Sequence, residues 1–118
     1  MLLQNVKEVL GAELLTEDLD ALSETEILTA CGCDLMSDVL AFVKEQTLLL
    51  TGLINSQVIR TAEMMDIRAI CFVRGKTPTE EVIDLANKKG IALLKTEESL
   101  YISCGKLYEQ GIRGRSIA

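Results

Sequence analysis

The sequence predicts an α/β fold, a three-layer α/β/α domain around a mainly parallel sheet of about five strands. Short, continuously apolar and β-prone runs, such as residues 47–50 and 69–73, are typical of strands buried on both faces. From residue 26 onward these runs alternate with amphipathic helical segments, and the connections are only two to six residues long. That alternation indicates βαβ units. The length of 118 residues fits one domain, over residues 1–118.

The amino-terminal part is predicted to contain a helix, a strand and an acidic connection. Asn5 can cap a short helix over residues 6–10, and Gly11 stands just beyond its end, where glycine commonly closes a helix. Residues 12–15 are expected to form a strand. Residues 16–23 carry several acidic side chains and are expected to connect this strand to the next one.

The next predicted unit is a strand over residues 26–31, followed by a turn at Gly32. Asp34 is expected to cap a helix over residues 35–44, because a short acidic side chain suits the first turn. The apolar residues of this segment recur at helical spacing. They are Leu35, Val39, Phe42 and Val43.

A buried-type strand over residues 47–50 leads through Gly52 into a helix over residues 56–65. The side chains expected to face the sheet from this helix are Val58, Ile59, Ala62 and Met65.

The clearest unit lies at residues 69–90. An apolar strand over residues 69–73 is followed by a turn and then by Thr77, which can cap a helix. Pro78 suits the first helical position, and Glu80 stands where a capping box needs a carboxylate. Gly90 is expected to end this helix.

The last predicted strand covers residues 91–94, and Thr96 is expected to cap the final helix. This helix carries Leu100, Cys104 and Leu107 on one side. Glu97 and Glu98 would then lie in the first helical turn, where carboxylates suit the helix dipole. Tyr101 and Tyr108 are seven residues apart on one face, which suits packing or a dimer surface. Residues 110–118 are expected to be a loose basic tail.

Composition excludes several functions. The net charge is −6, and the chain has only four aromatic residues, so nucleic acid is not an expected partner. The apolar runs are far shorter than the roughly 18 residues of a membrane span, and no signal-peptide pattern follows Met1. We therefore expect a cytoplasmic protein that does not bind membranes.

The chain contains no histidine, which removes Ser-His and Cys-His nucleophiles and histidine metal ligands. Cys31, Cys33, Cys71 and Cys104 lack the paired spacing of a zinc site and are expected to be reduced core thiols. A metal or a disulfide at Cys31 and Cys33 is the alternative. No catalytic residues, resident metal or cofactor are predicted.

Three glycine turns are expected to meet at the carboxyl edge of the parallel sheet. Each turn leads into a helix amino terminus, which favours an anion, and two cationic side chains stand in the third turn. The candidate ligand-binding residues are Asp34, Thr51, Gly52, Asn55, Arg74, Gly75, Lys76 and Thr77. The alternative is that these residues only turn the chain, cap helices and contact solvent. A P-loop is excluded, because Ile70 replaces its first glycine and Pro78 follows directly.

The motifs around these turns resemble the DRTGG domain family. They are residues 34–41, Leu50-Thr51-Gly52, Val73-Arg74-Gly75 with Pro78, and residues 90–94, in an order that extends over about residues 11–111. The chain departs from the family pattern at residues 53–55, where an Asp-Arg pair is expected, and at Arg74-Gly75-Lys76, which replaces a Thr-Gly-Gly-type turn.

The resemblance implies a compact α/β/α domain similar to the amino-terminal domain of HPr kinase/phosphorylase. Members of the DRTGG domain family occur alone or fused to CBS-domain pyrophosphatases and phosphotransacetylases, with roles in dimerisation and regulation. We therefore expect a noncatalytic, ligand-sensing homodimer that binds a small anionic or nucleotide-like ligand. The alternatives are a module that recruits a partner enzyme and, third, a phosphotransferase.

Overall fold

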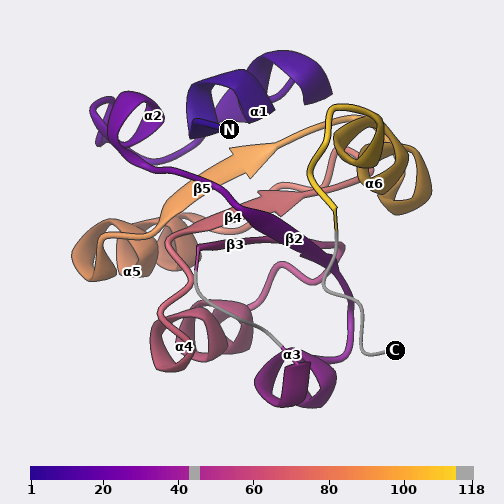
Figure 1. The fold of residues 1–118 in the computed structure, drawn as a ribbon. Coiled ribbons are helices and arrows are strands. Elements are labelled where there is room, and N and C mark those ends of the chain that lie inside the picture. The colour runs from indigo at the N-terminus through magenta and orange to yellow at the C-terminus, as the bar shows by residue number, and fades with distance from the viewer. Residues whose placement is uncertain (43–45, 114–118) are drawn as a thin grey trace.

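A computed structural model of the chain describes residues 1–42 and 46–113. Its centre is a five-stranded sheet in the order β1-β5-β4-β3-β2 (Figure 1). The strands are β1 (Glu13–Leu14), β2 (Thr29–Gly32), β3 (Thr47–Thr51), β4 (Ala69–Phe72) and β5 (Ala92–Lys95). β2 to β5 are mutually parallel, whereas β1 pairs antiparallel with β5. The predicted α/β fold with a mainly parallel sheet is confirmed.

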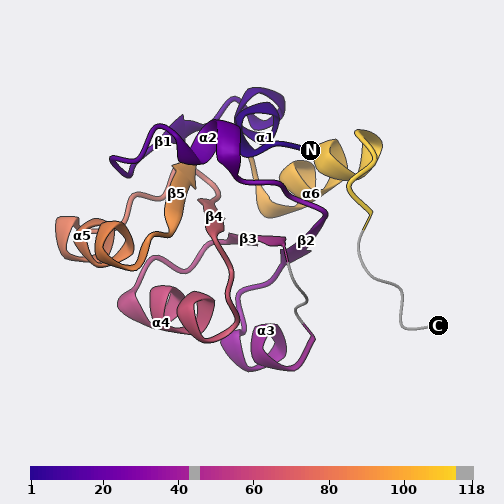
Figure 2. The same ribbon diagram turned by 60° about the vertical axis from the view of Figure 1, so that its left-hand side comes forward.

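Helices cover both faces of the sheet (Figures 1 and 2). The three helices that connect successive parallel strands lie on one face: α3 (Met36–Phe42), α4 (Ser56–Met64) and α5 (Glu80–Lys89). The other face is covered from the two ends of the chain by α1 (Leu3–Leu10), α2 (Ala21–Glu24) and α6 (Leu100–Glu109). No helix of the described residues is long and apolar enough to cross a membrane.

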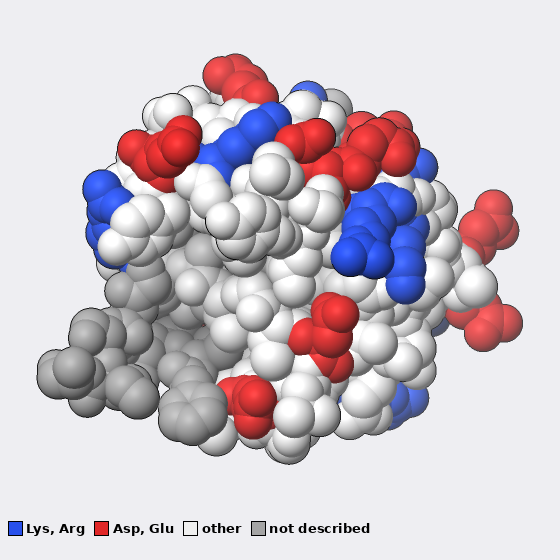
Figure 3. All heavy atoms as spheres, turned by 90° about the vertical axis from the view of Figure 1, so that its right-hand side faces the viewer, with Lys and Arg blue, Asp and Glu red and all other residues white. Residues whose placement is uncertain are grey.

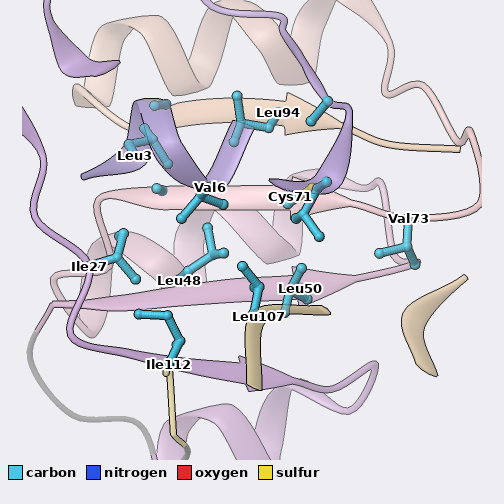
Figure 4. Close-up of a cluster of buried hydrophobic side chains, with 14 residues drawn as sticks. Leu3, Val6, Ile27, Leu48, Leu50, Cys71, Val73, Leu94, Leu107 and Ile112 are labelled. Carbon is cyan, nitrogen blue, oxygen red and sulfur yellow. The ribbon is translucent and has the colours of Figure 1, made fainter. Parts of the chain in front are cut away.

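Successive side chains of a strand point to opposite faces of the sheet, so the apolar central strands contribute to two separate cores, one on each face. Leu48 and Leu50 of β3 point toward α1 and α6, where Val6 and Leu107 meet them (Figure 4). Leu49, between them, belongs to the core beneath α3, α4 and α5. All five residues of β3 are buried, which agrees with the buried strand predicted from the apolar run.

The amino-terminal helix differs from the prediction at its start. α1 begins at Leu3, so Asn5 lies inside the first turn and does not cap the helix. The N–H of Leu3 donates instead to the carbonyl of Thr25, at 2.9 Å. Gly11 ends the helix with φ 58°, as predicted. The expected acidic connection contains α2, one short turn of helix.

The second strand is shorter than predicted, and the helix after it begins one residue later than predicted. β2 begins at Thr29, and Leu28 before it is 58% exposed. The side chains that α3 buries are Met36 and Val39, whereas Leu35 is exposed and precedes the helix. The side chain of Phe42 and residues 43–45, which include Val43, lie outside the described part of the chain.

In α4, Val58, Ile59 and Ala62 are buried as predicted, but Met65 lies just beyond the helix and is half-buried. α5 begins at Glu80, two residues later than expected, with Thr79 at its N-cap. Thr77 and Pro78 therefore belong to the preceding turn, and the capping box predicted for them is wrong. Gly90 ends α5 with φ 70°, as predicted.

α6 is capped by Ser99, whose Oγ accepts from the N–H of Ile102 at 3.2 Å. The prediction that Thr96 caps this helix is wrong, because the Thr96 hydroxyl is buried and donates to the carbonyl of Leu10 at 2.7 Å. The prediction of a loose tail over residues 110–118 is wrong for its first residues. Ile112 is buried, and Thr29 Oγ1 donates to the carbonyl of Arg113. Residues 114–118 lie outside the described part.

Gly32 is required by the packing of α6 on β2. A Cβ at this position would lie 2.5 Å from Cys104 Sγ and 3.2 Å from Leu100 Cδ1. We expect Gly32→Ala to lower the free energy of unfolding by about 1–3 kcal/mol, measured by urea denaturation. The loss should be smaller in a Cys104→Ala background, because the nearest atom is then gone. Equal losses in both backgrounds would contradict this packing.

Candidate functional site

The three predicted turns do meet at the carboxyl edge of the parallel strands, as expected of parallel neighbours. Backbone hydrogen bonds join them in sequence along the edge. The N–H of Cys33 donates to the carbonyl of Leu50, and the N–H of Val73 donates to that of Thr51. The fourth strand continues the row, because the N–H of Gly75 donates to the carbonyl of Thr96 at 2.8 Å.

Asp34 connects the first turn to the second. One carboxylate oxygen accepts from Thr51 Oγ1 at 2.9 Å and from the N–H of Gly52 at 2.7 Å. Thr51 is fully buried, and its hydroxyl also accepts from the N–H of Leu53. The predicted capping of α3 by Asp34 is therefore wrong: the carboxylate fixes the turn after β3 instead.

Asn55 begins α4 by accepting from the N–H of Gln57 at 3.1 Å, so this predicted site residue has a structural role. It also lines a groove of about 710 Å³ between α4 and α5. Apolar side chains of Ile54, Val82 and Leu85 contribute to the groove, which reaches Thr79 at the start of α5. The carboxyl edge thus borders a partly apolar hollow.

The third turn has an unusual backbone. Arg74 and Gly75 have φ angles of 60° and 66°, and the N–H of Lys76 donates back to the carbonyl of Val73. Two successive positive φ angles with this hydrogen bond are the pattern of a type I′ turn. The left-handed conformation is uncommon for arginine, and the Arg74 N–H is held by the carbonyl of Glu98 at 2.8 Å.

The side chains of Arg74, Lys76 and Thr77 are exposed. Neither cation forms an ion pair with another residue of the described ranges. Figure 3 looks onto this edge and shows basic side chains next to acidic ones. The two cations are therefore available to an anion from solvent.

Glu97 is a member of this edge that the sequence interpretation missed. Its carboxylate lies so close to Gly75 that a Cβ there would collide with it. Glu97 and Glu98 were expected in the first turn of a helix, but α6 begins at Leu100, so both lie in the connecting loop. Ser99 is a residue type that favours the N-cap position, and its presence in the sequence could have indicated that α6 begins at Leu100. The turn accordingly carries a negative charge as well as two positive ones.

Three of the four cysteine thiols have a raised pKa. Burial raises the pKa of the Cys71 thiol from 9.0 to about 12. Burial is also the main cause that raises the pKa of Cys31, followed by its neighbours Cys33, Cys104 and Asp38, and burial raises the pKa of Cys104. All four cysteines are free thiols, and no group of potential metal ligands gathers within the described residues.

Comparison with known proteins identifies the fold and the family. The sequence profile described as "DRTGG domain" matches residues 5–107. The chain belongs to the DRTGG domain family. No curated protein sequence matches it.

The DRTGG fold is also found in a solved structure. The CBS and DRTGG domains of the regulatory region of Clostridium perfringens pyrophosphatase, complexed with the activator diadenosine tetraphosphate, superpose with a TM-score of 0.71. The sequences are 17% identical, and the match covers 89% of this chain and 45% of that one. The chain therefore spans less than half of that regulatory region, and the likeness establishes the fold.

The raised pKa of Cys71 predicts a pH dependence of stability. The folded pKa of about 12 lies above the ordinary value of 9.0, so between these values the unfolded state loses the proton first. The free energy of unfolding should therefore fall as the pH rises above 9, by at most about 1.4 kcal/mol per pH unit from this group. Urea denaturation from pH 8 to pH 11 should show that the free energy of unfolding declines less steeply with pH for Cys71→Ala than for the wild type. Parallel slopes for the two proteins would contradict the burial of this thiol.

Proposed function

We propose that this DRTGG domain is a noncatalytic, dimeric ligand-sensing module. Its ligand is a small anion or a nucleotide-like molecule, bound at the carboxyl edge of the sheet. The contacting residues are Thr51, Gly52, Arg74, Gly75 and Lys76, beside Asp34, Asn55 and Thr77. The observation that carries the proposal is the pair of exposed cations on the turn between β4 and α5, neither of which forms an ion pair with an acidic residue that the structure describes.

The backbone of this turn supports a binding role. Arg74 is held in a left-handed conformation by hydrogen bonds to the loop before α6. An uncommon conformation of this kind has an energetic cost and recurs at ligand-binding positions. Here it places two exposed cations on one turn, next to the Glu97 carboxylate that lies at Gly75.

The groove between α4 and α5 supports the nucleotide-like class. Ligand sites commonly combine an apolar wall with a few polar groups that fix orientation. Asn55 lies on both the groove and the carboxyl edge, so one molecule can place an anionic group at the edge and a flat apolar group in the groove. The pyrophosphatase regulatory region, which was crystallised with a dinucleotide activator, supports the same class of ligand.

The chemistry of the residues supports a noncatalytic role. Histidine is absent, and burial, full at Cys71 and partial at Cys31 and Cys104, raises the pKa of these three thiols, so they are protonated at neutral pH and poor nucleophiles. The carboxylate of Asp34 is engaged by Thr51 and Gly52 as a structural acceptor. Binding at this edge therefore serves recognition, and its output is a change in assembly or in a partner enzyme.

Calorimetric titration with diadenosine tetraphosphate, ATP and inorganic phosphate tests the proposal. We expect the double variant Arg74→Ala/Lys76→Ala to weaken binding about 10- to 100-fold, because charge-assisted hydrogen bonds are lost. Arg68→Ala is the matched control: this exposed cation precedes β4 at the opposite, amino edge of the sheet, and its ion pair with Asp66 is exposed. Glu97→Gln should strengthen binding about two- to fivefold, because a competing carboxylate beside Gly75 loses its charge.

Two results would count against the site. One is that none of the three probes binds the wild-type protein. The other is that the double variant binds a probe as tightly as the wild type and Arg68→Ala do.

A further inference from the structure

The outward face of α6 exposes more aromatic surface than the fold requires. Tyr101 is 85% exposed and Tyr108 is 56% exposed, and these are the only tyrosines of the chain. Ile102, at 43%, lies beside them. These side chains border a hollow of about 510 Å³ that also reaches Gly105. We call this set of four residues the α6 face.

The core does not account for the α6 face. α6 packs on the sheet through its opposite side, where Ser103 and Leu107 are buried and Leu100 and Cys104 are partly buried. Other large apolar residues are exposed elsewhere, such as Met64 at 73%, but Met64 lies on α4 across the sheet. Clustered exposed aromatic side chains are characteristic of protein interfaces.

Charges around the α6 face are balanced although the chain carries a net charge of −6. Lys106 pairs with Glu98 at 3.1 Å, and the guanidinium carbon of Arg113 lies 4.1 Å from the centre of the Tyr108 ring. Glu109 is the remaining acidic residue that borders the hollow. Within the described ranges, two acidic and two basic residues thus surround the aromatic pair, so two copies of this acidic protein can meet here with little repulsion.

We propose that the α6 face is the interface of a homodimer in which two α6 helices cross antiparallel about a two-fold axis at Gly105. This inference rests on the dimeric part of the proposed function and names its surface. Gly105 lies between the two tyrosines, four residues after Tyr101 and three before Tyr108, so an axis close to this glycine brings Tyr101 of one protomer near Tyr108 of the partner subunit. A Cβ at Gly105 would meet no atom within 4 Å, so this glycine leaves room for the second helix to approach.

The arrangement is self-complementary, as a two-fold interface must be. Each protomer offers two protruding rings and one hollow, and the antiparallel crossing lets the rings of one protomer border the hollow of the other.

The size of the α6 face indicates a weak dimer. From their exposed fractions, the two tyrosines offer about 200–350 Å² per protomer, whereas a standard interface buries about 800 Å² per partner. Ile102 and the stem of Lys106 add to this area. We therefore expect a dissociation constant in the micromolar range, at which assembly responds to small changes in free energy.

The ion pair between Glu98 and Lys106 connects the α6 face to the candidate ligand site. The carbonyl of Glu98 accepts from the N–H of Arg74, and its carboxylate pairs with Lys106 beside the tyrosines. A ligand on the Arg74 turn therefore acts on a loop that is bonded to the dimer surface. Coupling between two binding equilibria is reciprocal, so a ligand that strengthens dimerisation must bind the dimer more tightly than it binds the monomer.

Sedimentation velocity of the ligand-free protein, from about 1 to 200 μM, tests the interface. We expect the wild type to dimerise and Tyr101→Glu and Gly105→Gln to weaken dimerisation at least tenfold. Gly105→Gln replaces a helical glycine with a better helix former in open space, so its monomer should fold with unchanged or raised thermal stability. Met64→Glu is the matched control, since it introduces the same charge at an exposed apolar residue outside the α6 face, and it should dimerise like the wild type.

A wild type that stays monomeric throughout this range would overturn the inference. So would dimerisation of Tyr101→Glu and Gly105→Gln equal to that of the wild type, which would place the interface on another surface while leaving the dimeric function intact. Calorimetry with diadenosine tetraphosphate on the same samples separates the two proposals. Probe binding by a monomeric wild type refutes the interface and the dimeric part of the proposed function but leaves the ligand site intact. A dimer that binds no probe refutes only the ligand site.

Discussion

The parallel strands of this domain follow one another in a single direction across the sheet, and this constraint determines the rest of the structure. Neighbouring strands β2, β3, β4 and β5 are consecutive in the chain, so their crossover helices all lie on one face. The second face has to be covered by helices from the two ends of the chain. α1 and α6 do so, and the buried hydrogen bond from Thr96 to the carbonyl of Leu10 joins β5 to the end of α1.

The same constraint builds the candidate site. Four parallel strands end at one edge, and each of the turns that follow them is hydrogen-bonded to a neighbour: Asp34 binds the turn at Gly52, and the Arg74 turn binds the loop before α6. The polar groups of three turns are therefore fixed by backbone contacts, while Arg74 and Lys76 are left exposed. The loop before α6 joins this edge to the outward face of the last helix. The proposed recognition at the edge and the proposed assembly through α6 therefore involve one connected segment.

The sequence was sufficient to predict the layers, the central strands and the edge at which the turns meet. Continuous apolar runs identify β3 and β4, and Gly11 and Gly90 end their helices where the pattern indicates. Helix starts were predicted less well, because several neighbouring residues are suitable N-caps and tertiary hydrogen bonds determine which of them caps the helix. Asp34 binds Gly52 across the edge, Thr96 binds Leu10, and Ser99 caps α6 instead. Glu97 was missed as a neighbour of Gly75 because only the turn geometry brings it there.

The central claim is that an anionic ligand binds at the carboxyl edge, and amide chemical-shift mapping tests it most directly. Titration of ¹⁵N-labelled protein with diadenosine tetraphosphate should shift the amide signals of residues 51–55 and 74–77 most strongly, together with those of residues 97–99. Signals at the amino edge, such as those of residues 66–68, should change little. Shifts confined to residues outside the carboxyl edge, or no shifts at saturating ligand, would contradict the account.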